Sequence, residues 1–408
     1  MTMLDPTVGE RRGARVSRDV YTSDEIYRLE KERVFGRTWH FACLTSDLKK
    51  PGDFFTVTVA DQPLILLRGN DDVIRAFFNV CTHRAAILTG QKCGNYGRVL
   101  KCMYHAWAFN LEGELVGVPY EEGYGPDFDR GELGLVSVSV DTFFDLVFVA
   151  INPRVPSLVD YLGEIVDHLG PYVQGIEAIG RNSWTYEGNW KLWHENFRDN
   201  YHPEFAHRNI HDIIPHYADR GGNWALEPAH SVLQWVAEAP NAKAYIRSLR
   251  RYSGVEFAEN DTPSFSNPEG FHEAPQEVLA VFPNLDVQPG PKTRGRGMKA
   301  GYIQTVTPLS PSRSRVDMVV YSAVDDDPET RARNLENLAD SQGSWGKISG
   351  DDTEAAHRCQ MGAQGTGTRE SIFTRGVAPG NGGQDADPRD EYSLRIFYRA
   401  YDDYLSAE

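Results

Sequence analysis

The sequence lacks any long hydrophobic run. Among its 408 residues the longest apolar stretches, such as 64–67 and 146–151, are far shorter than the ~20 residues of a membrane-spanning helix. The first 21 residues also lack the apolar segment of a secretory signal and contain several arginines instead. We therefore expect a cytoplasmic protein with no membrane association.

Positive charge and cysteine are also scarce. The net charge of -16 argues against a nucleic-acid partner, for which a basic stripe is expected. Of the five cysteines, Cys43, Cys93 and Cys359 stand apart from any motif. This odd remainder is not the pattern of a secreted disulfide framework, so we expect reduced thiols.

Two short segments each combine one cysteine with one histidine. They read Cys81-Thr82-His83 and Cys102-Met103-Tyr104-His105. A Rieske [2Fe–2S] cluster takes two thiolates on one iron and two imidazoles on the other. Structural zinc sites more often pair like ligands along the chain. The mixed half-sites therefore favour a cluster held by Cys81, His83, Cys102 and His105 over a zinc ion with the same ligands.

Four basic residues lie near these half-sites in an otherwise acidic chain. They are Arg84, Lys92, Arg98 and Lys101. One interpretation is that they steer an acidic electron donor toward the cluster. An ordinary solvated loop surface explains them equally well.

The pattern of apolar residues predicts an α+β fold. Short apolar segments between 53 and 151 indicate an antiparallel β domain with the two half-sites at strand ends, and Asn152–Pro156 marks its boundary. Helical spacing is expected near 23–35, 158–169, 190–201, 329–339, 353–361 and 392–404, and strands near 232–236, 278–282, 302–306 and 316–323. A Gly-, Asp- and Pro-rich stretch, 365–391, indicates an extended arm. We expect an N-terminal helical segment at 1–37 that packs on a catalytic domain at 156–408, with the β domain at 38–155.

A second group of metal-binding residues lies between 189 and 207. Asp199 and His202 are three residues apart on one helical face, Pro203 ends that helix, and His207 follows. Two histidines and one carboxylate form the facial triad that binds Fe(II) and leaves positions open for O2 and substrate. Asp351-Asp352, expected at a helix start, is the best source of the carboxylate, although helix capping also explains this pair. Without the neighbouring motif residues, ordinary core or surface histidines would explain His202 and His207 as well as metal binding does.

The motifs occur in the order of a known family. The cluster motif, Asn189-Trp190-Lys191, Glu195-Asn196 and Asp199-x2-His202-x4-His207 resemble the large (alpha) subunit of Rieske non-heme iron ring-hydroxylating oxygenases over nearly the whole chain. The resemblance implies a catalytic domain of the helix-grip type. It also implies that His202, His207 and Asp352 bind the iron, and that Asn196 and Phe197 line the substrate pocket. Asp199 resembles the aspartate that links this iron to a cluster histidine of a neighbouring subunit.

The same resemblance implies cofactors and partners. They are a [2Fe–2S] Rieske cluster, mononuclear Fe(II), O2 as co-substrate and a small aromatic substrate. Electrons come from NAD(P)H through a reductase, with or without a ferredoxin. The subunits form a homotrimer or an α3β3 assembly with a small beta subunit.

The chain departs from the family pattern at several positions. Ala106 stands where glycine is usual, Met103 stands where proline is common, and His194 has no assigned role. The 195–199 segment is one residue shorter than in naphthalene-type members and is similar to that of benzoate- and salicylate-type members. This likeness implies an aromatic carboxylate substrate.

Three arginines near the second motif are candidates for binding such a carboxylate. They are Arg198, Arg208 and Arg220. A guanidinium group binds a carboxylate through two parallel hydrogen bonds. Surface arginines with no such role are the alternative.

Three other functions compete with ring dihydroxylation. A monooxygenase or demethylase uses the same metals on the same scaffold. A Rieske electron carrier without catalysis needs the cluster alone, and it binds two irons per chain rather than three. A zinc-stabilised structural protein would be colourless.

Overall fold

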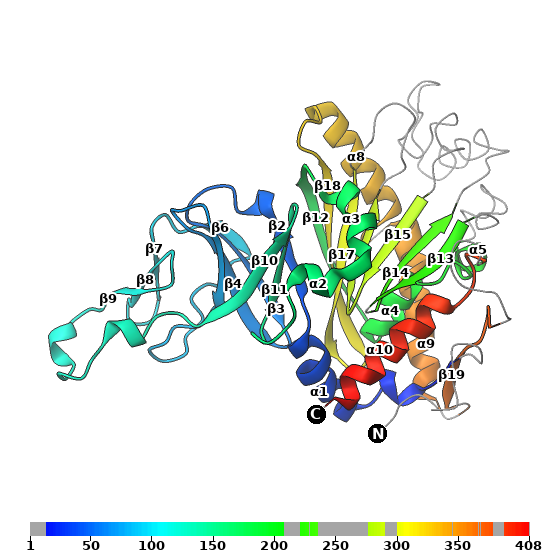
Figure 1. Ribbon diagram of the computed structural model, residues 1–408, viewed down its shortest axis with the longest axis horizontal. Helices are drawn as coiled ribbons and strands as arrows, with labels where there is room; N and C mark the ends of the chain where they lie inside the picture. The colour runs from blue at the N-terminus through cyan, green and yellow to red at the C-terminus, as the bar shows by residue number, and fades with distance from the viewer. Residues whose placement is uncertain are drawn as a thin grey trace. The chain divides into compact units, whose positions relative to one another are not determined.

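The computed structural model describes residues 14–207, 221–227, 229–235, 276–289, 300–344, 346–365, 367, 369–377 and 387–407. The chain divides into two compact units. One is Glu30–Tyr161, and the other joins the N-terminal segment through Leu29 to Leu162–Glu408. Each unit is built around its own antiparallel sheet of seven strands (Figure 1).

The smaller unit contains the first sheet, in the strand order β2-β11-β10-β5-β4-β3-β6. Its strands are β2 (His40–Leu44), β3 (Asp53–Val59), β4 (Gln62–Arg68), β5 (Ile74–Phe78), β6 (Cys93–Asn95), β10 (Ser137–Phe143) and β11 (Leu146–Ala150). Side chains alternate between the faces of a strand. Ile65 therefore joins the apolar cluster that contains Cys81 and Cys102, whereas Leu64 packs in a second cluster. The sheet thus has a core on each face, and one of these cores anchors both motif cysteines.

A separate three-stranded sheet positions the second Cys-His segment. It consists of β7 (Val99–Lys101), β8 (Ala108–Asn110) and β9 (Leu115–Gly117). Antiparallel pairing of β7 with β8 makes residues 102–107 the loop of a hairpin. The first Cys-His segment follows β5. Both segments thus lie in loops next to strands, as the sequence predicts.

The larger unit contains the second sheet, in the order β12-β18-β17-β16-β15-β14-β13. Its strands are β12 (Ile176–Tyr186), β13 (Gly221–Leu226), β14 (His230–Trp235), β15 (Gln276–Val281), β16 (Leu285–Pro289), β17 (Gly301–Ser310) and β18 (Arg313–Ala323). A short two-stranded sheet pairs β1 (Ala14–Ser17) with β19 (Glu370–Phe373), so part of the predicted extended arm forms a strand.

Helices complete the described structure. They are α1 (Asp24–Leu29), α2 (Leu158–Leu162), α3 (Val166–Val173), α4 (Trp190–Asn196), α5 (Pro203–Ala206), α8 (Pro328–Ser341), α9 (Lys347–Gln364) and α10 (Tyr392–Ser406). Short 3-10 turns cover Arg18–Tyr21, Phe35–Arg37, Thr45–Asp47, Glu121–Gly123, Arg130–Glu132 and Gly163–Ile165. In Figure 1, α4, α9 and α10 lie beside the sheet of the larger unit. The α+β fold with two antiparallel sheets is therefore confirmed.

Two predicted helices are shorter than expected. The helix expected at 23–35 ends as an α-helix at Leu29 and continues as a π turn over Glu30–Val34. The wider turn leaves Val34 buried. The helix expected at 190–201 ends at Asn196. The N–H groups of Phe197 and Arg198 donate to carbonyls three residues back, and the Asp199 carboxylate then accepts from the N–H of Tyr201.

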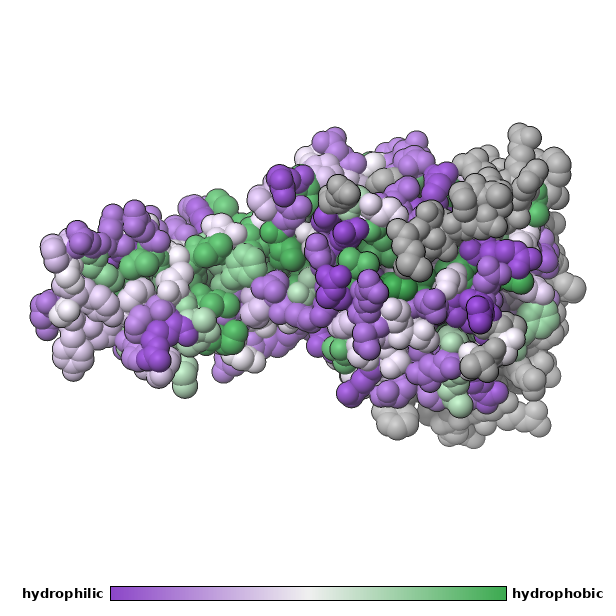
Figure 2. Space-filling view, turned by 90° about the horizontal axis from the view of Figure 1, so that it is seen from below, coloured by the Kyte–Doolittle hydropathy of each residue, from purple (hydrophilic) through white to green (hydrophobic). Residues whose placement is uncertain are grey.

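Polar and apolar residues alternate over the visible surface. The face in Figure 2 shows hydrophilic residues over much of both units and hydrophobic residues among them on the smaller unit. None of the helices in the described ranges is long and apolar enough to cross a membrane.

Candidate metal centres

The two Cys-His loops of the smaller unit share one backbone design. In each loop the cysteine N–H donates to the carbonyl five residues later at 2.8 Å. The N–H four residues after the cysteine donates to the cysteine carbonyl at 3.0 Å. That fourth residue is Ala85 in one loop and Ala106 in the other, with φ of 56° and 60°. The two half-sites are therefore copies of one tight turn.

The two cysteines of the motif lie in the core, and the two histidines lie nearer the surface. Cys81 and Cys102 are 2% and 3% exposed, whereas His83 and His105 are half-buried. The imidazole rings lie edge to face, with 4.6 Å between centroids, and His83 stacks on Trp107. Burial raises the pKa of the Cys81 thiol, and the neighbouring Cys102 thiol raises it further. Two facing thiols and two facing imidazoles fit a cluster with thiolates on one iron and imidazoles on the other.

Alanine occupies the left-handed position of both turns. An L-residue with a Cβ in this region costs roughly 1–2 kcal/mol, and glycine avoids this cost. In the sequence, only Ala106 departs visibly from the family pattern. Nothing local marks Ala85, and the equivalence of the two positions follows from their matching φ values.

The basic residues near the cluster motif are all exposed. The set is Arg84, Lys92, Arg98 and Lys101. Arg84 lies over the Tyr104 ring, with 5.3 Å from its Cζ to the ring centroid. Exposure agrees with both interpretations, donor steering and an ordinary surface.

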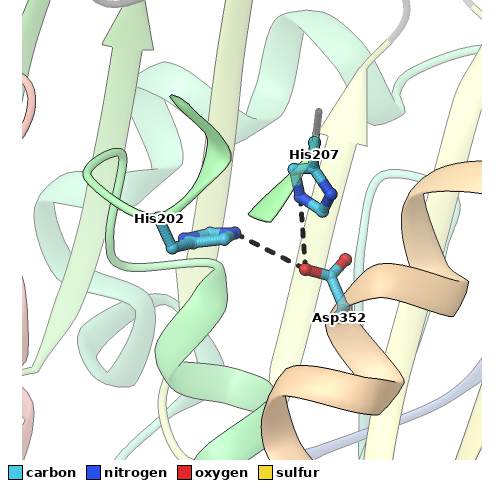
Figure 3. A group of neighbouring side chains, drawn as sticks. All are labelled: His202, His207 and Asp352. Carbon is cyan, nitrogen blue, oxygen red and sulfur yellow. Dashed lines mark ion pairs between the residues drawn. The ribbon is translucent and has the colours of Figure 1, made fainter. Parts of the chain in front are cut away.

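The larger unit brings His202, His207 and Asp352 together. One ligand atom from each lies within 4.8 Å of the others. The Nε2 atoms of His202 and His207 are 3.5 Å and 3.3 Å from Oδ1 of Asp352 (Figure 3). Neighbouring ligands on one ion with bonds of 2.0–2.2 Å stand about 3 Å apart, so the group fits a single metal ion.

Two segments position this group. His202 precedes α5, whose first residue Pro203 fits a helix N-terminus, and His207 ends the same short helix. Asp352 comes from α9, 145 residues beyond His207. All three side chains are buried or half-buried.

Helix capping does not explain the aspartate pair. Helix α9 begins at Lys347, so Asp351 and Asp352 lie in its second turn, beyond the free N–H groups of the first turn. Asp352 is 4% exposed and points toward both histidines. Asp351 instead places Oδ2 3.4 Å from Nδ1 of His207. The two carboxylates therefore approach opposite nitrogens of one imidazole.

The remaining predicted site residues surround the triad. Oδ2 of Asp199 lies 3.3 Å from Nδ1 of His202. The Asn196 amide donates to Oδ1 of Asp352 at 3.2 Å, and Phe197 is 7% exposed. Asn196 thus contacts a residue of the metal group directly.

Electrostatics make the group a cation site. Burial lowers the pKa of His202, but hydrogen bonds to Asp199 and Asp352 outweigh burial and raise that pKa to about 10. Burial raises the pKa of Asp352, but the two histidines lower it to about 2. A buried anion between two imidazoles holds either a proton or a metal cation, so metal binding displaces protons.

Arg198 is an interior residue and not a surface arginine. Its side chain is 0% exposed. Nε donates to Nε2 of His194 at 3.1 Å, and Nη1 donates to the Ser231 hydroxyl at 3.1 Å. On its other side, His194 places Nδ1 2.7 Å from Oδ1 of Asp286. His194 thus joins Arg198 to strand β16. Arg208 and Arg220 lie outside the described residues.

Glu195 of α4 lies in a separate buried cluster. The hydroxyls of Tyr21 and Tyr398 both donate to its Oε1, the first at 2.9 Å. Burial raises the pKa of Glu195 to about 7 despite these hydrogen bonds. The two tyrosines lie near opposite ends of the chain, so no sequence pattern pointed to them.

Comparison with known proteins identifies both units. Residues 38–138 match the family model of the Rieske [2Fe-2S] domain, and residues 176–407 match that of the ring hydroxylating alpha subunit (catalytic domain). The chain is 28% identical to the 2-aminobenzenesulfonate 2,3-dioxygenase subunit alpha of an Alcaligenes species, over 95% of this chain and 93% of that one. It is also 28% identical to the anthranilate 1,2-dioxygenase large subunit of Burkholderia cepacia, with the same coverage.

A solved structure shares the fold. Naphthalene 1,2-dioxygenase from a Rhodococcus species, bound to indole, superposes with a TM-score of 0.80 at 22% identity, over 97% of this chain and 95% of that one. The match to a catalytic domain excludes an electron carrier without catalysis. The two family matches imply a Rieske [2Fe–2S] cluster and a mononuclear iron. The cysteines and histidines of the smaller unit and the His-His-Asp group of the larger unit are the ligand types that these cofactors need. The chain therefore belongs to the family of ring-hydroxylating oxygenase alpha subunits and is an oxygenase.

Proposed function

We propose that this protein is the terminal oxygenase component that hydroxylates an aromatic acid with O2. Cys81, His83, Cys102 and His105 hold the cluster, and His202, His207 and Asp352 hold the iron. Bound iron supplies O2 activation with electrons from the cluster. The observation that carries the proposal is the triad, because Nε2 atoms of two histidines lie 3.5 Å and 3.3 Å from one buried carboxylate oxygen.

The residues around the triad have distinct roles. Asn196 holds the Asp352 carboxylate, and Asp351 orients His207 through its other nitrogen. Asn196 and Phe197 form one wall of the substrate pocket. We assign Asp199 to the link between His202 and a cluster histidine of a neighbouring subunit, in a homotrimer or an α3β3 assembly. Its contact with Nδ1 of His202 leaves Nε2 on the metal side.

Electrons enter from NAD(P)H through a reductase, with or without a ferredoxin. The exposed basic residues near the cluster loops support an acidic donor, since complementary charge speeds association. Dependence on NAD(P)H and three unpaired cysteines outside the cluster motif, Cys43, Cys93 and Cys359, support a cytoplasmic enzyme.

The substrate proposal rests on the relatives. The two relatives above are named for 2-aminobenzenesulfonate and anthranilate, and both compounds are aromatic acids. The 195–199 segment, with the length typical of benzoate- and salicylate-type members, agrees with this class. Arg198 does not serve as the acid-binding group, because its side chain is 0% exposed and donates to His194 and Ser231 inside the unit.

Labelled dioxygen tests the reaction. The iron-loaded full chain, with a reductase and NAD(P)H, is supplied with 18O2 and a panel of benzoates and benzenesulfonates. We expect both labelled atoms in one diol product. One labelled atom, or formaldehyde from a methoxybenzoate, would establish the monooxygenase or demethylase alternative. The absence of product with every aromatic acid would contradict the substrate proposal.

A further inference from the structure

Three oxygen atoms from distant segments of the larger unit meet beside α4. Oε1 of Glu195 lies 2.9 Å from the Tyr21 hydroxyl and also contacts the Tyr398 hydroxyl. The two hydroxyl oxygens lie 2.8 Å from each other. Tyr21 belongs to the N-terminal 3-10 turn and Tyr398 to α10, so only the fold brings these groups together. The three residues are called the Glu195 triangle below.

The two tyrosines enclose the triangle, and the glutamate lies at its edge. Tyr21 and Tyr398 are each 1% exposed, and Phe373 stacks on the Tyr398 ring with 5.3 Å between the ring centroids. Glu195 is half-buried. The hydroxyl groups are therefore withdrawn from water, whereas solvent protons can reach the glutamate.

The number of protons in the triangle depends on the charge of Glu195. Distances of 2.9 Å and 2.8 Å are those of O–H···O hydrogen bonds, and each tyrosine supplies one hydroxyl proton. With Glu195 ionised, two protons serve three contacts, and one pair of oxygens has no proton between them. With Glu195 protonated, each group donates to one neighbour and accepts from the other. The geometry therefore fits a protonated carboxyl group.

The electrostatic surroundings make Glu195 the titrating group of the triangle. Burial and the charge of Glu195 raise the pKa of both tyrosines, so their hydroxyls stay neutral. Burial also raises the pKa of Glu195 to about 7, although the two hydroxyls and Lys191 lower it and Asp199 raises it. The other titratable groups that interact with Glu195 are Tyr186 of β12 and Cys359 of α9.

Asp199 connects the triangle with the metal group. It follows Glu195 by four residues and places Oδ2 3.3 Å from Nδ1 of His202. An electron that enters the triad adds negative charge to this part of the unit. An ionised Glu195 repels that added charge, and a protonated Glu195 does not. The charge of the triangle can therefore change how readily the electron arrives.

We propose that the Glu195 triangle holds one proton that controls electron transfer to the metal group by way of Asp199. When Oε1 binds a proton from water, Glu195 loses its charge and no longer adds to the negative charge of Asp199. When the proton returns to water, a second carboxylate charge stands near Asp199 and opposes the electron. Glu195 is thus a positioning residue that acts through Asp199, and the inference rests on the proposed function.

Infrared spectroscopy on the full, metal-loaded chain tests whether the triangle holds the proton. The carbonyl stretch of a protonated carboxyl group is separate from the bands of an ionised carboxylate, and it shifts in D2O. Below neutral pH we expect such a band, and Glu195→Gln should remove it. Glu354→Gln, which changes an exposed glutamate of α9, is the control and should keep it. If Glu195→Gln removes no such band, the proposal is wrong.

The Asp199→Asn variant measures the coupling without any change to the triangle. The negative charge of Asp199 disfavours ionisation of Glu195, so its removal should lower the midpoint of the infrared titration by about one pH unit. An unchanged midpoint would overturn the link between Glu195 and Asp199.

Reoxidation of the reduced cluster in a single turnover tests control of electron transfer. Glu195→Gln is neutral at every pH, so the ratio of its rate to the wild-type rate should rise roughly tenfold from below to above neutral pH. A substitution that only disturbed packing would slow the variant equally at every pH, and a constant ratio would refute the proposal. An infrared band coupled to Asp199, in a chain that oxygenates no aromatic acid, would refute the proposed function alone.

Discussion

The two proposed metal centres differ in how their candidate ligands are brought together. The cluster residues occupy two copies of one turn within 81–107, and each turn is closed by its own backbone hydrogen bonds. The triad of the larger unit spans 202–352, and only the packing of α9 against α4 and α5 brings Asp352 to the histidines. A centre whose ligands lie close together in the chain can be predicted from a short sequence motif. A centre assembled by helix packing can be located only once the fold is known. The same difference predicts how each centre responds to substitution.

Loss of a cluster ligand has the largest expected effect. In Cys81→Ser or His105→Ala, we expect no cluster, since one of the two irons loses one of its two protein ligands. The reduced protein should then lack the Rieske signal in electron paramagnetic resonance. Cys93→Ser, an exposed cysteine in β6, is the matched control and should keep the signal. A cluster signal that survives in either ligand variant would refute the assignment.

Loss of a histidine of the triad should have the second-largest effect, and it should change only the larger unit. His202→Ala or His207→Ala should remove the mononuclear iron and product formation, and the cluster spectrum should persist because its loops fold separately. Metal analysis and resonance spectra on the same sample measure both. His357→Gln changes a half-buried histidine of α9 that contacts the Glu187 carbonyl, and it should retain iron. Activity near wild type without His202 would show that the triad is not the catalytic centre.

The adjacent aspartates should rank in a defined order. Asp352→Ala removes the carboxylate between both histidines and should abolish iron binding. Asp351→Ala removes only the contact to Nδ1 of His207. Loss of a residue that orients a metal ligand typically lowers metal affinity 10–100-fold. Iron titration of the two variants gives the order. The reverse ranking would transfer the ligand role to Asp351.

The smallest expected effect concerns the strained cluster loop. Ala106→Gly should stabilise the cluster-loaded protein by about 1 kcal/mol, because glycine adopts positive φ without a Cβ clash. Urea denaturation followed by the cluster absorbance measures the change. Ala108→Gly, two residues later in β8, should have the opposite sign, since glycine weakens a strand. Destabilisation by Ala106→Gly would mean that the left-handed turn carries no strain.

The sequence predicted local features better than distant ones. The strands and both cluster loops follow from apolar alternation and from the cysteines themselves. The C-terminal end of α4 was predicted five residues too late, because apolar spacing does not mark the tighter turn that closes the helix after Asn196. No spacing rule placed Asp352 beside His202. The buried chain of Arg198, His194 and Asp286 was equally invisible, since its members come from α4, its C-terminal turn and a distant strand.

Electron transfer to the iron is the central claim, and Asp199→Asn tests it most directly. The change keeps the size of the side chain but removes the charge beside Nδ1 of His202. The variant is reduced, mixed with substrate and O2 for a single turnover, and assayed for iron content and for cluster reoxidation. We predict that iron stays bound while the cluster remains reduced. If the variant loses iron and activity to the same extent, Asp199 only orients His202. Normal cluster reoxidation in a variant that keeps its iron would contradict the account.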